Sequence, residues 1–153
     1  GRRVIADAGT LLVTIRNVKT RSETGDTWLF LDAGTELLPS MSQYKWYYHV
    51  ISADRTAEPH ETPYKLAGPL CDGGDVYFDI EGTGRLPQYR FLPKGLTIGN
   101  VLAVLDVGAY TVAQMSTYNG RPLPAVVLIR SSEDVRLIRP RQTYEDLVRD
   151  EAL

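Results

Sequence analysis

Short apolar runs recur along the 153-residue chain and predict β-strands, not long helices. In the run 11–18, Leu11, Val13 and Ile15 fall on one face of an extended chain, with Thr14 and Arg16 on the other. Further strands are expected at 27–31, 47–52, 75–80, 101–107, 125–130 and 135–138. Turns rich in Gly, Pro, Asn and Asp separate these runs. This pattern predicts a mainly β fold, a Greek-key-like barrel or sandwich.

Two short helices are expected to accompany the strands. One is expected at 110–118, and the other closes the chain, where Thr143 is a candidate N-cap with Asp146 three residues on. The stretches 36–45 and 80–94 carry Pro, Ser and Gly in place of a regular pattern and are expected to be long loops. Long irregular loops in a compact domain often carry function.

Composition narrows the class of protein. Hydrophobic residues make up 43% and charged residues 24%, which is the balance of one globular domain. A net charge of -2 gives no general basic field, so neither nucleic acid nor membrane is an expected partner, and no apolar run is long enough to span a bilayer. The single cysteine, Cys71, has no disulfide partner, and His49 and His60 lack the spacing of a zinc site, so no metal is expected. With no signal-peptide pattern, we expect a cytoplasmic protein.

The most distinctive local motif is Gly-Pro-Leu-Cys-Asp-Gly-Gly-Asp at 68–75. Its two central glycines allow positive φ and a sharp reversal, which would present Cys71 and Asp72 at the tip of a turn. A tight turn beside a buried cysteine accounts for the same residues, since an unpaired cysteine is often buried.

Three more residues are candidates, each with a plainer alternative. Asp32 ends a predicted strand and could bind an amine or make an Asx turn. Tyr110 opens a predicted helix and could donate to a phosphate, or simply pack half-buried. Arg2 could hold a phosphate through its fork of donors, or be a solvated terminal arginine.

The order of these motifs is more specific than any one of them. Gly-Arg at the start, Leu-Asp-Ala-Gly at 31–34, Gly-Pro-x-Cys-Asp-x-x-Asp at 68–75, Asp-x-Gly-Ala-Tyr at 106–110 and Tyr-Asn-Gly-Arg-Pro at 118–122 follow one another. The series resembles the C-terminal half of the ornithine/diaminopimelate decarboxylases, which are alanine-racemase-like enzymes dependent on pyridoxal phosphate. The resemblance covers nearly the whole chain, and its most specific part is Cys-Asp-x-x-Asp followed by Gly-Ala-Tyr.

The resemblance implies that residues 1–153 are the C-terminal β-domain of a two-domain enzyme. The N-terminal α/β barrel, which carries the lysine that holds pyridoxal phosphate, has no counterpart in this sequence. The glutamate that precedes the family's Gly-Arg is also missing before Gly1. The expected partners are therefore this chain's own barrel, a second copy in a homodimer, and a small amino-acid substrate. Alone, the chain is expected to be inactive.

The resemblance also assigns roles to the candidates. Arg2 and Tyr110 match residues that contact the cofactor phosphate, which suits their donors. Cys71 matches a residue that helps to return a proton to the substrate carbon, and Asp72 matches one that binds the distal amine across the dimer interface. Asp32 matches an acid on the substrate side. The full-length protein would be a carboxy-lyase, with the cofactor as electron sink.

Departures from the family pattern bear on the substrate. Diaminopimelate-specific members carry an Arg-Pro soon after Asp-Ala-Gly, but no arginine lies between Gly34 and Tyr48 here, and the acid after Cys71 is Asp, not Glu. Both favour a basic or diamino amino acid, or a conjugate, although the tail at 143–147 is more typical of the diaminopimelate branch. A non-catalytic regulatory relative and an amino-acid racemase are the alternatives.

Overall fold

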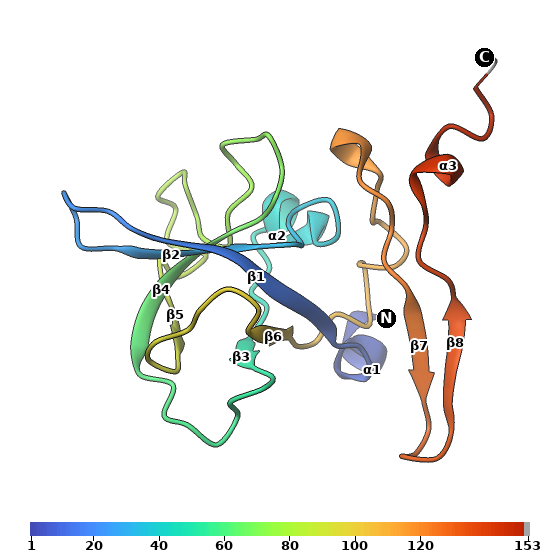
Figure 1. Cartoon of the computed structure of the whole chain (residues 1–153), viewed down its shortest axis with the longest axis horizontal. Coiled ribbons are helices and arrows are strands. Elements are labelled where there is room, and N and C mark those ends of the chain that lie inside the picture. The colour runs from blue at the N-terminus through green and yellow to red at the C-terminus, as the bar shows by residue number, and fades with distance from the viewer. Residues whose placement is uncertain (152–153) are drawn as a thin grey trace. The chain divides into compact units, whose positions relative to one another are not determined.

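The computed structural model describes residues 1–151 and forms two units, a larger one of residues 1–115 and a smaller one that begins at Ser116. The larger unit is built on six strands in the order β3-β6-β1-β2-β4-β5 (Figure 1). Their bounds are β1 Leu11–Thr20, β2 Thr27–Leu31, β3 Val50–Ser52, β4 Thr62–Ala67, β5 Arg90–Leu92 and β6 Val101–Val104. The sheet curls until its end strands β3 and β5 approach each other, so it forms a nearly closed barrel. This architecture confirms the prediction of a mainly β fold.

The long strand β1 shows how the sequence pattern positions the core. Val13 and Ile15 are buried, and Leu12, which directly precedes Val13 on the opposite face, is exposed, as the alternation predicts. β1 pairs with β2 and with β6, both antiparallel. Their inward side chains, together with those of β4, fill the barrel. The largest fully buried side chains are Tyr48, Tyr77, Ile15, Leu29, Leu31, Leu38, Met41, Leu66, Leu92, Leu102, Val13 and Val104.

Short helices lie outside the sheet of the larger unit. α1 spans Arg2–Ile5 and continues into a 3-10 turn at Ala6–Ala8, and α2 spans Pro39–Tyr44. α2 falls within 36–45, where the sequence predicted a loop. Pro39 stands in the first turn of α2, where its missing N–H costs no hydrogen bond.

Two of the predicted elements of the larger unit are wrong. The segment 75–80 is not a strand: Val76 makes only an isolated bridge to Ala67, although Asp75, Tyr77 and Asp79 are buried alternately, as in a strand. The helix predicted at 110–118 is replaced by turns at 108–114, where Tyr110 has φ 61°. A left-handed backbone at Tyr110 ends any continuous right-handed helix through this position.

The other predicted strands are confirmed, some of them with shorter or longer bounds. The runs 11–18 and 27–31 are strands, whereas the runs 47–52 and 101–107 are strands only at 50–52 and 101–104. β4 and β5 were not predicted from the sequence. β5 has only three residues, and β4 contains Pro63, which is unusual within a strand.

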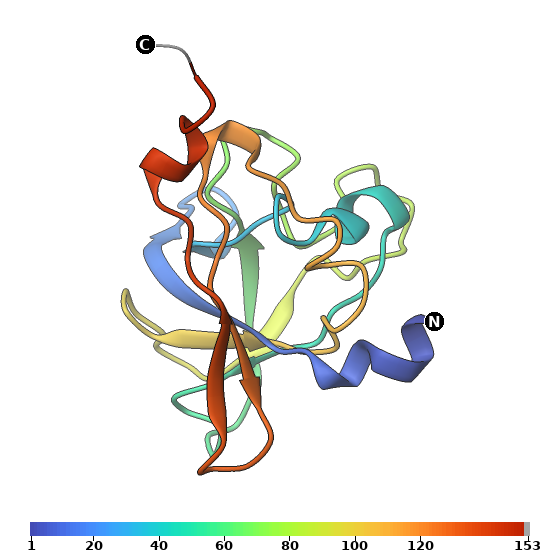
Figure 2. The ribbon, with the colours of Figure 1, turned by 90° about the vertical axis from the view of Figure 1, so that its right-hand side faces the viewer.

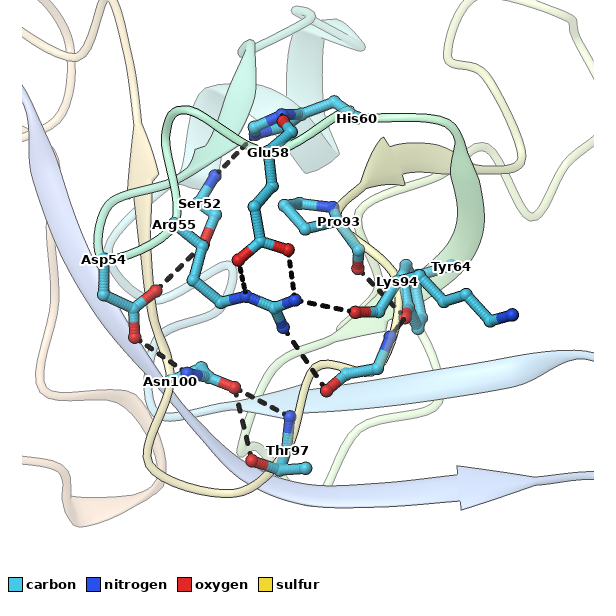
Figure 3. Close-up of polar contacts among 11 residues, drawn as sticks. Ser52, Asp54, Arg55, Glu58, His60, Tyr64, Pro93, Lys94, Thr97 and Asn100 are labelled. Carbon is cyan, nitrogen blue, oxygen red and sulfur yellow. Dashed lines mark hydrogen bonds and ion pairs between the residues drawn. The ribbon is translucent and has the colours of Figure 1, made fainter.

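A polar network joins the β3–β4 loop to the β5–β6 loop (Figure 3). Arg55 forms an ion pair with Glu58 and donates to the carbonyl oxygens of Lys94 at 2.9 Å and Gly95 at 3.4 Å. Asp54 accepts from the Asn100 side chain at 2.8 Å. Hydrogen bonds from these two neighbouring residues therefore fix the ends of β3 and β6 at one end of the barrel.

The smaller unit is an antiparallel hairpin of β7, Val126–Ile129, and β8, Val135–Arg139, preceded by a 3-10 turn at Tyr118–Gly120. Figure 2 shows the two strands as a ribbon that leads into α3, Tyr144–Leu147. The Thr143 hydroxyl accepts from the Asp146 N–H, and the Asp146 carboxylate accepts from the Thr143 N–H, so the predicted capping box is confirmed. Within residues 1–151, no helix is long and apolar enough to cross a membrane.

Candidate functional site

Two of the sequence motifs meet at one edge of the sheet, because β2 and β4 are parallel neighbours and end side by side. The segment 32–35 leaves β2, and the turn 68–75 leaves β4. Gly34 and Gly68 face each other so closely that a Cβ on Gly68 would lie 2.5 Å from the Gly34 Cα. The fold therefore brings Leu-Asp-Ala-Gly and Gly-Pro-Leu-Cys-Asp-Gly-Gly-Asp together, although residues 35–67 separate them in the sequence.

Cys71 and Asp72 are both exposed on the turn 68–75, as the sequence predicted, and the alternative of a buried cysteine is wrong. The origin of the turn differs from the prediction, since neither Gly73 nor Gly74 has a positive φ. The reversal is instead an Asx turn, in which Oδ1 of Asp72 accepts from the Gly74 N–H at 2.8 Å. The thiol and the carboxylate are thus presented by a local hydrogen bond of Asp72 itself.

Asp32 bridges β2 and β1. Its Oδ1 accepts from the Thr14 N–H at 2.7 Å, and its Oδ2 lies 3.1 Å from Nη2 of Arg16. Both partners lie on the neighbouring strand β1. These contacts therefore do not form the Asx turn that was considered for this residue. The Asp32 side chain is 27% exposed and already holds a guanidinium. Its carboxylate is thus shown to bind a cationic group of its own chain.

Arg2 and Tyr110, the two candidates for binding a phosphate, meet on Trp46. The Arg2 guanidinium carbon lies 4.5 Å from the centroid of the Trp46 ring, and the Tyr110 ring meets Trp46 edge-on at 5.1 Å. The close passage of the N-terminal segment places Arg2 here, since a Cβ on Gly108 would lie 1.9 Å from the carbonyl oxygen of Ile5. The sequence analysis missed Trp46, which follows α2 and lies between the predicted loop 36–45 and the predicted strand 47–52.

The donors of this cluster fit an anionic group. Nε of Arg2 is buried and has no hydrogen-bond partner within residues 1–151. A buried donor without an acceptor is costly, and an incoming phosphate oxygen would relieve that cost. Tyr110 is 43% exposed and is held at φ 61°, an unfavourable conformation that is often retained where function requires it. No group of His, Cys, Asp and Glu able to hold a metal ion occurs in this described part of the chain.

Tyr77 lies behind the turn 68–75. Its hydroxyl donates to the carbonyl oxygen of Ala33 at 2.9 Å, and the side chain is buried. Burial raises the pKa of Tyr77 well above its usual value of 10.0, and the nearby carboxylates of Asp75 and Glu36 raise it further. Tyr77 therefore stays a neutral donor that holds the segment after β2.

Known proteins resemble this chain in both sequence and fold. Residues 3–108 match the family described as pyridoxal-dependent decarboxylase, C-terminal sheet domain. The match includes Asp32, Cys71 and Asp72, while Arg2 and Tyr110 lie just outside it. The predicted roles of all five residues stay predictions.

Individual relatives match the chain over almost its whole length. It is 33% identical over 149 residues to the diaminopimelate decarboxylase of Methanothermobacter thermautotrophicus, covering 97% of this chain and 32% of the relative. It is 36% identical to that of Escherichia coli K12, covering 100% of this chain and 36% of the relative. The crystal structure of diaminopimelate decarboxylase from M. jannaschii superposes with a TM-score of 0.83 at 33% identity, covering 100% of this chain and 32% of that one.

The chain therefore spans about a third of the length of the curated relatives it matches. The match to the family model covers more than half of its residues, and the barrel-like sheet is that of a C-terminal sheet domain. On these grounds the chain belongs to the family of pyridoxal-dependent decarboxylases and corresponds to their C-terminal sheet domain.

Proposed function

We propose that this chain is the C-terminal domain of a pyridoxal-phosphate-dependent carboxy-lyase that removes CO₂ from a basic or diamino amino acid, or from a conjugate of one. The observation that carries the proposal is the exposed pair Cys71 and Asp72, presented on a fixed turn at the edge of the sheet. A thiol beside a carboxylate supplies a proton donor and a cation-binding group within one short turn.

Arg2 and Tyr110 would hold the cofactor phosphate. Both lie against Trp46, and the buried Nε of Arg2 lacks an acceptor within the described residues. Two such donors suit a dianionic phosphate. When bound, pyridoxal phosphate supplies the electron sink that makes loss of CO₂ from an amino acid feasible. This chain's own contribution is to position the cofactor and to supply the proton donor.

Cys71 would hold at its Sγ the proton that is returned to the substrate carbon once CO₂ has left. Asp72 would bind the distal amine of the substrate through its carboxylate. Because both residues are exposed on the turn, they can complete an active site whose other groups lie on another surface. We therefore propose the N-terminal barrel of the same protein and a second copy in a homodimer as partners, and no catalysis by residues 1–153 alone.

The residues present favour a substrate with a cationic side chain. Asp72 offers one carboxylate to an amine, and no arginine lies between Gly34 and Tyr48 to bind a second substrate carboxylate. The relatives named above are diaminopimelate decarboxylases, so diaminopimelate belongs in any substrate panel. We expect diamino acids that lack the second carboxylate to be better substrates.

The test is CO₂ release by the full-length protein with added pyridoxal phosphate, measured over a panel of lysine, ornithine, diaminopimelate and neutral amino acids. Asp72→Asn should raise KM for diamino acids more than it lowers kcat, because it removes the charge that binds the distal amine. Cys71→Ala should lower the amount of amine formed per CO₂, and Cys71→Ser should restore part of it. Glu23→Gln, an exposed change in the β1–β2 turn, is the control and should match the wild type. No CO₂ from any amino acid would refute the proposal.

A further inference from the structure

The carboxylate of Asp75 joins the two loops that meet at the edge of the sheet. Its Oδ1 accepts from the Thr35 N–H at 2.7 Å, and its Oδ2 accepts from the Leu70 N–H at 2.8 Å. Thr35 belongs to the segment after β2, and Leu70 directly precedes Cys71. The side chain is 2% exposed, so both bonds are shielded from water. One buried carboxylate therefore spans the segment that carries Asp32 and the turn that carries Cys71.

The backbone around Asp75 is shaped to admit this carboxylate. A Cβ on Gly34 would lie 2.1 Å from Oδ1 of Asp75, and a Cβ on Gly68 would lie 2.2 Å from Oδ2. Neither glycine is needed for a positive φ, since neither has one. Their role is to let two backbones close on the carboxylate from opposite sides, which only residues without a side chain allow.

The main chain of Asp75 closes the turn at its other end. The Gly68 N–H donates to the Asp75 carbonyl oxygen at 2.9 Å, and the Asp75 N–H donates to the Asp72 carbonyl oxygen at 3.1 Å. Asp75 thus contacts the turn through its side chain before Cys71 and through its backbone at Asp72. Cys71 lies between these attachment points, and Asp72 is itself the second of them.

We propose that Asp75 is a positioning residue that fixes Cys71 and Asp72 relative to the segment carrying Asp32, with Gly34 and Gly68 serving to admit its carboxylate. The part of this inference that concerns turnover rests on the proposed decarboxylase function. Asp75 itself is buried behind the turn and does not contact substrate. Its effect is to hold the Cys71 thiol in one position at the edge of the sheet. A proton donor needs such a fixed position to reach one particular carbon atom of the substrate.

Asp75→Asn tests this with little change in shape. An asparagine keeps one acceptor oxygen, but its NH₂ group then faces a backbone N–H, so one of the two hydrogen bonds becomes a contact between two donors. In the full-length protein, amide hydrogen exchange in the peptides containing 34–36 and 68–72 should speed up about tenfold or more, as expected for the loss of a hydrogen bond to a charged group. The amine formed per CO₂ should fall, as for Cys71→Ala.

Asp79→Asn is the matched control. Asp79 is another buried aspartate, and its carboxylate accepts from the Glu81 N–H at 3.0 Å and the Arg85 N–H at 3.4 Å, both in the loop that follows. This variant should speed exchange in 79–85 while leaving exchange in 68–72 and the amine formed per CO₂ unchanged. If Asp75→Asn does not fold, residue-resolved exchange in the wild-type protein makes the test. The Thr35 and Leu70 amides, which donate to the buried carboxylate, should exchange more slowly than the exposed Cys71 amide, and equal rates would overturn the positioning role.

The outcomes separate the two proposals. Unchanged exchange in 34–36 and 68–72 in Asp75→Asn would overturn the positioning role, and so would an equal loss of amine in Asp79→Asn. A wild-type protein that releases no CO₂ would overturn the proposed function, and the exchange data would then decide alone whether Asp75 anchors the turn.

Discussion

Tyr77 lies behind the turn 68–75, and Tyr77→Phe removes its hydroxyl while leaving the buried ring in place. At pH 7 the variant loses the hydrogen bond to the Ala33 carbonyl oxygen, which is 2.9 Å long and shielded from water. Losing a buried hydrogen bond and leaving its acceptor unpaired costs about 1–2 kcal/mol. The free energy of unfolding of the chain should therefore fall by about that amount, again on the scale of one buried hydrogen bond.

Raising the pH should remove this difference. The pKa of Tyr77 in the folded chain is raised well above 10.0, mainly by burial, whereas in the unfolded chain it has its ordinary value. Below pH 10 the phenol is protonated in both states and its stabilising contribution is complete. Above pH 10 only the unfolded chain releases the proton, so the wild type loses stability as the pH rises towards the folded-state pKa. At pH 11 that loss reaches about 1.4 kcal/mol, which cancels the advantage of the hydroxyl.

The assay is equilibrium urea unfolding of wild type and Tyr77→Phe from pH 7 to pH 11. The wild type should be more stable at pH 7, and the two should become equal near the upper end of this range. Ile15→Val, which removes one buried methyl group and no titratable group, should cost about 0.5–1.5 kcal/mol at every pH. A difference between wild type and Tyr77→Phe that is the same at pH 7 and pH 11 would refute the assignment of a buried, neutral phenol.

Two further variants probe other parts of the larger unit. In the full-length protein, Trp46→Ala should weaken the binding of pyridoxal phosphate about tenfold, because it removes the ring that supports Arg2 and Tyr110, while Trp46→Phe should retain most of the affinity. Equal dissociation constants in a cofactor titration would count against this role. Arg55→Ala should speed amide exchange in the loop 93–100, since it removes the donors to the carbonyl oxygens of Lys94 and Gly95, and amides of β1 serve as the internal reference.

The sequence predicted those parts of the fold whose signal is local. β1 is long and its burial alternates from Leu12 to Arg16, and the capping box at Thr143 is complete within four residues. β4 and β5 were missed because their hydrophobic patterns are weak. β5 has only three residues, and the six residues of β4 include a proline. The helix at 110–118 was predicted wrongly because the residue types there do not indicate the left-handed φ of Tyr110.

The same limit applies to the site. The order of motifs was enough to select Cys71 and Asp72, and the structure places both on an exposed turn. The anchoring by Asp75 could not be derived, since spacing along the chain does not say that β2 and β4 are parallel neighbours. Trp46 was missed for a related reason: an aromatic residue in an irregular stretch gives no hint of which side chains from distant segments will pack on it.

The position of Trp46 has a spectroscopic consequence. The chain holds two tryptophans, and Trp28 packs against Phe30 and Phe78, away from the ring cluster of Trp46 and Tyr110. Trp28→Phe would leave Trp46 as the only indole emitter contributed by this domain. Pyridoxal phosphate absorbs in the region where indoles emit, so a cofactor bound near Arg2 would quench Trp46 by energy transfer. With the cofactor at the proposed site, the domain would carry its own optical reporter of cofactor loading, with no added dye.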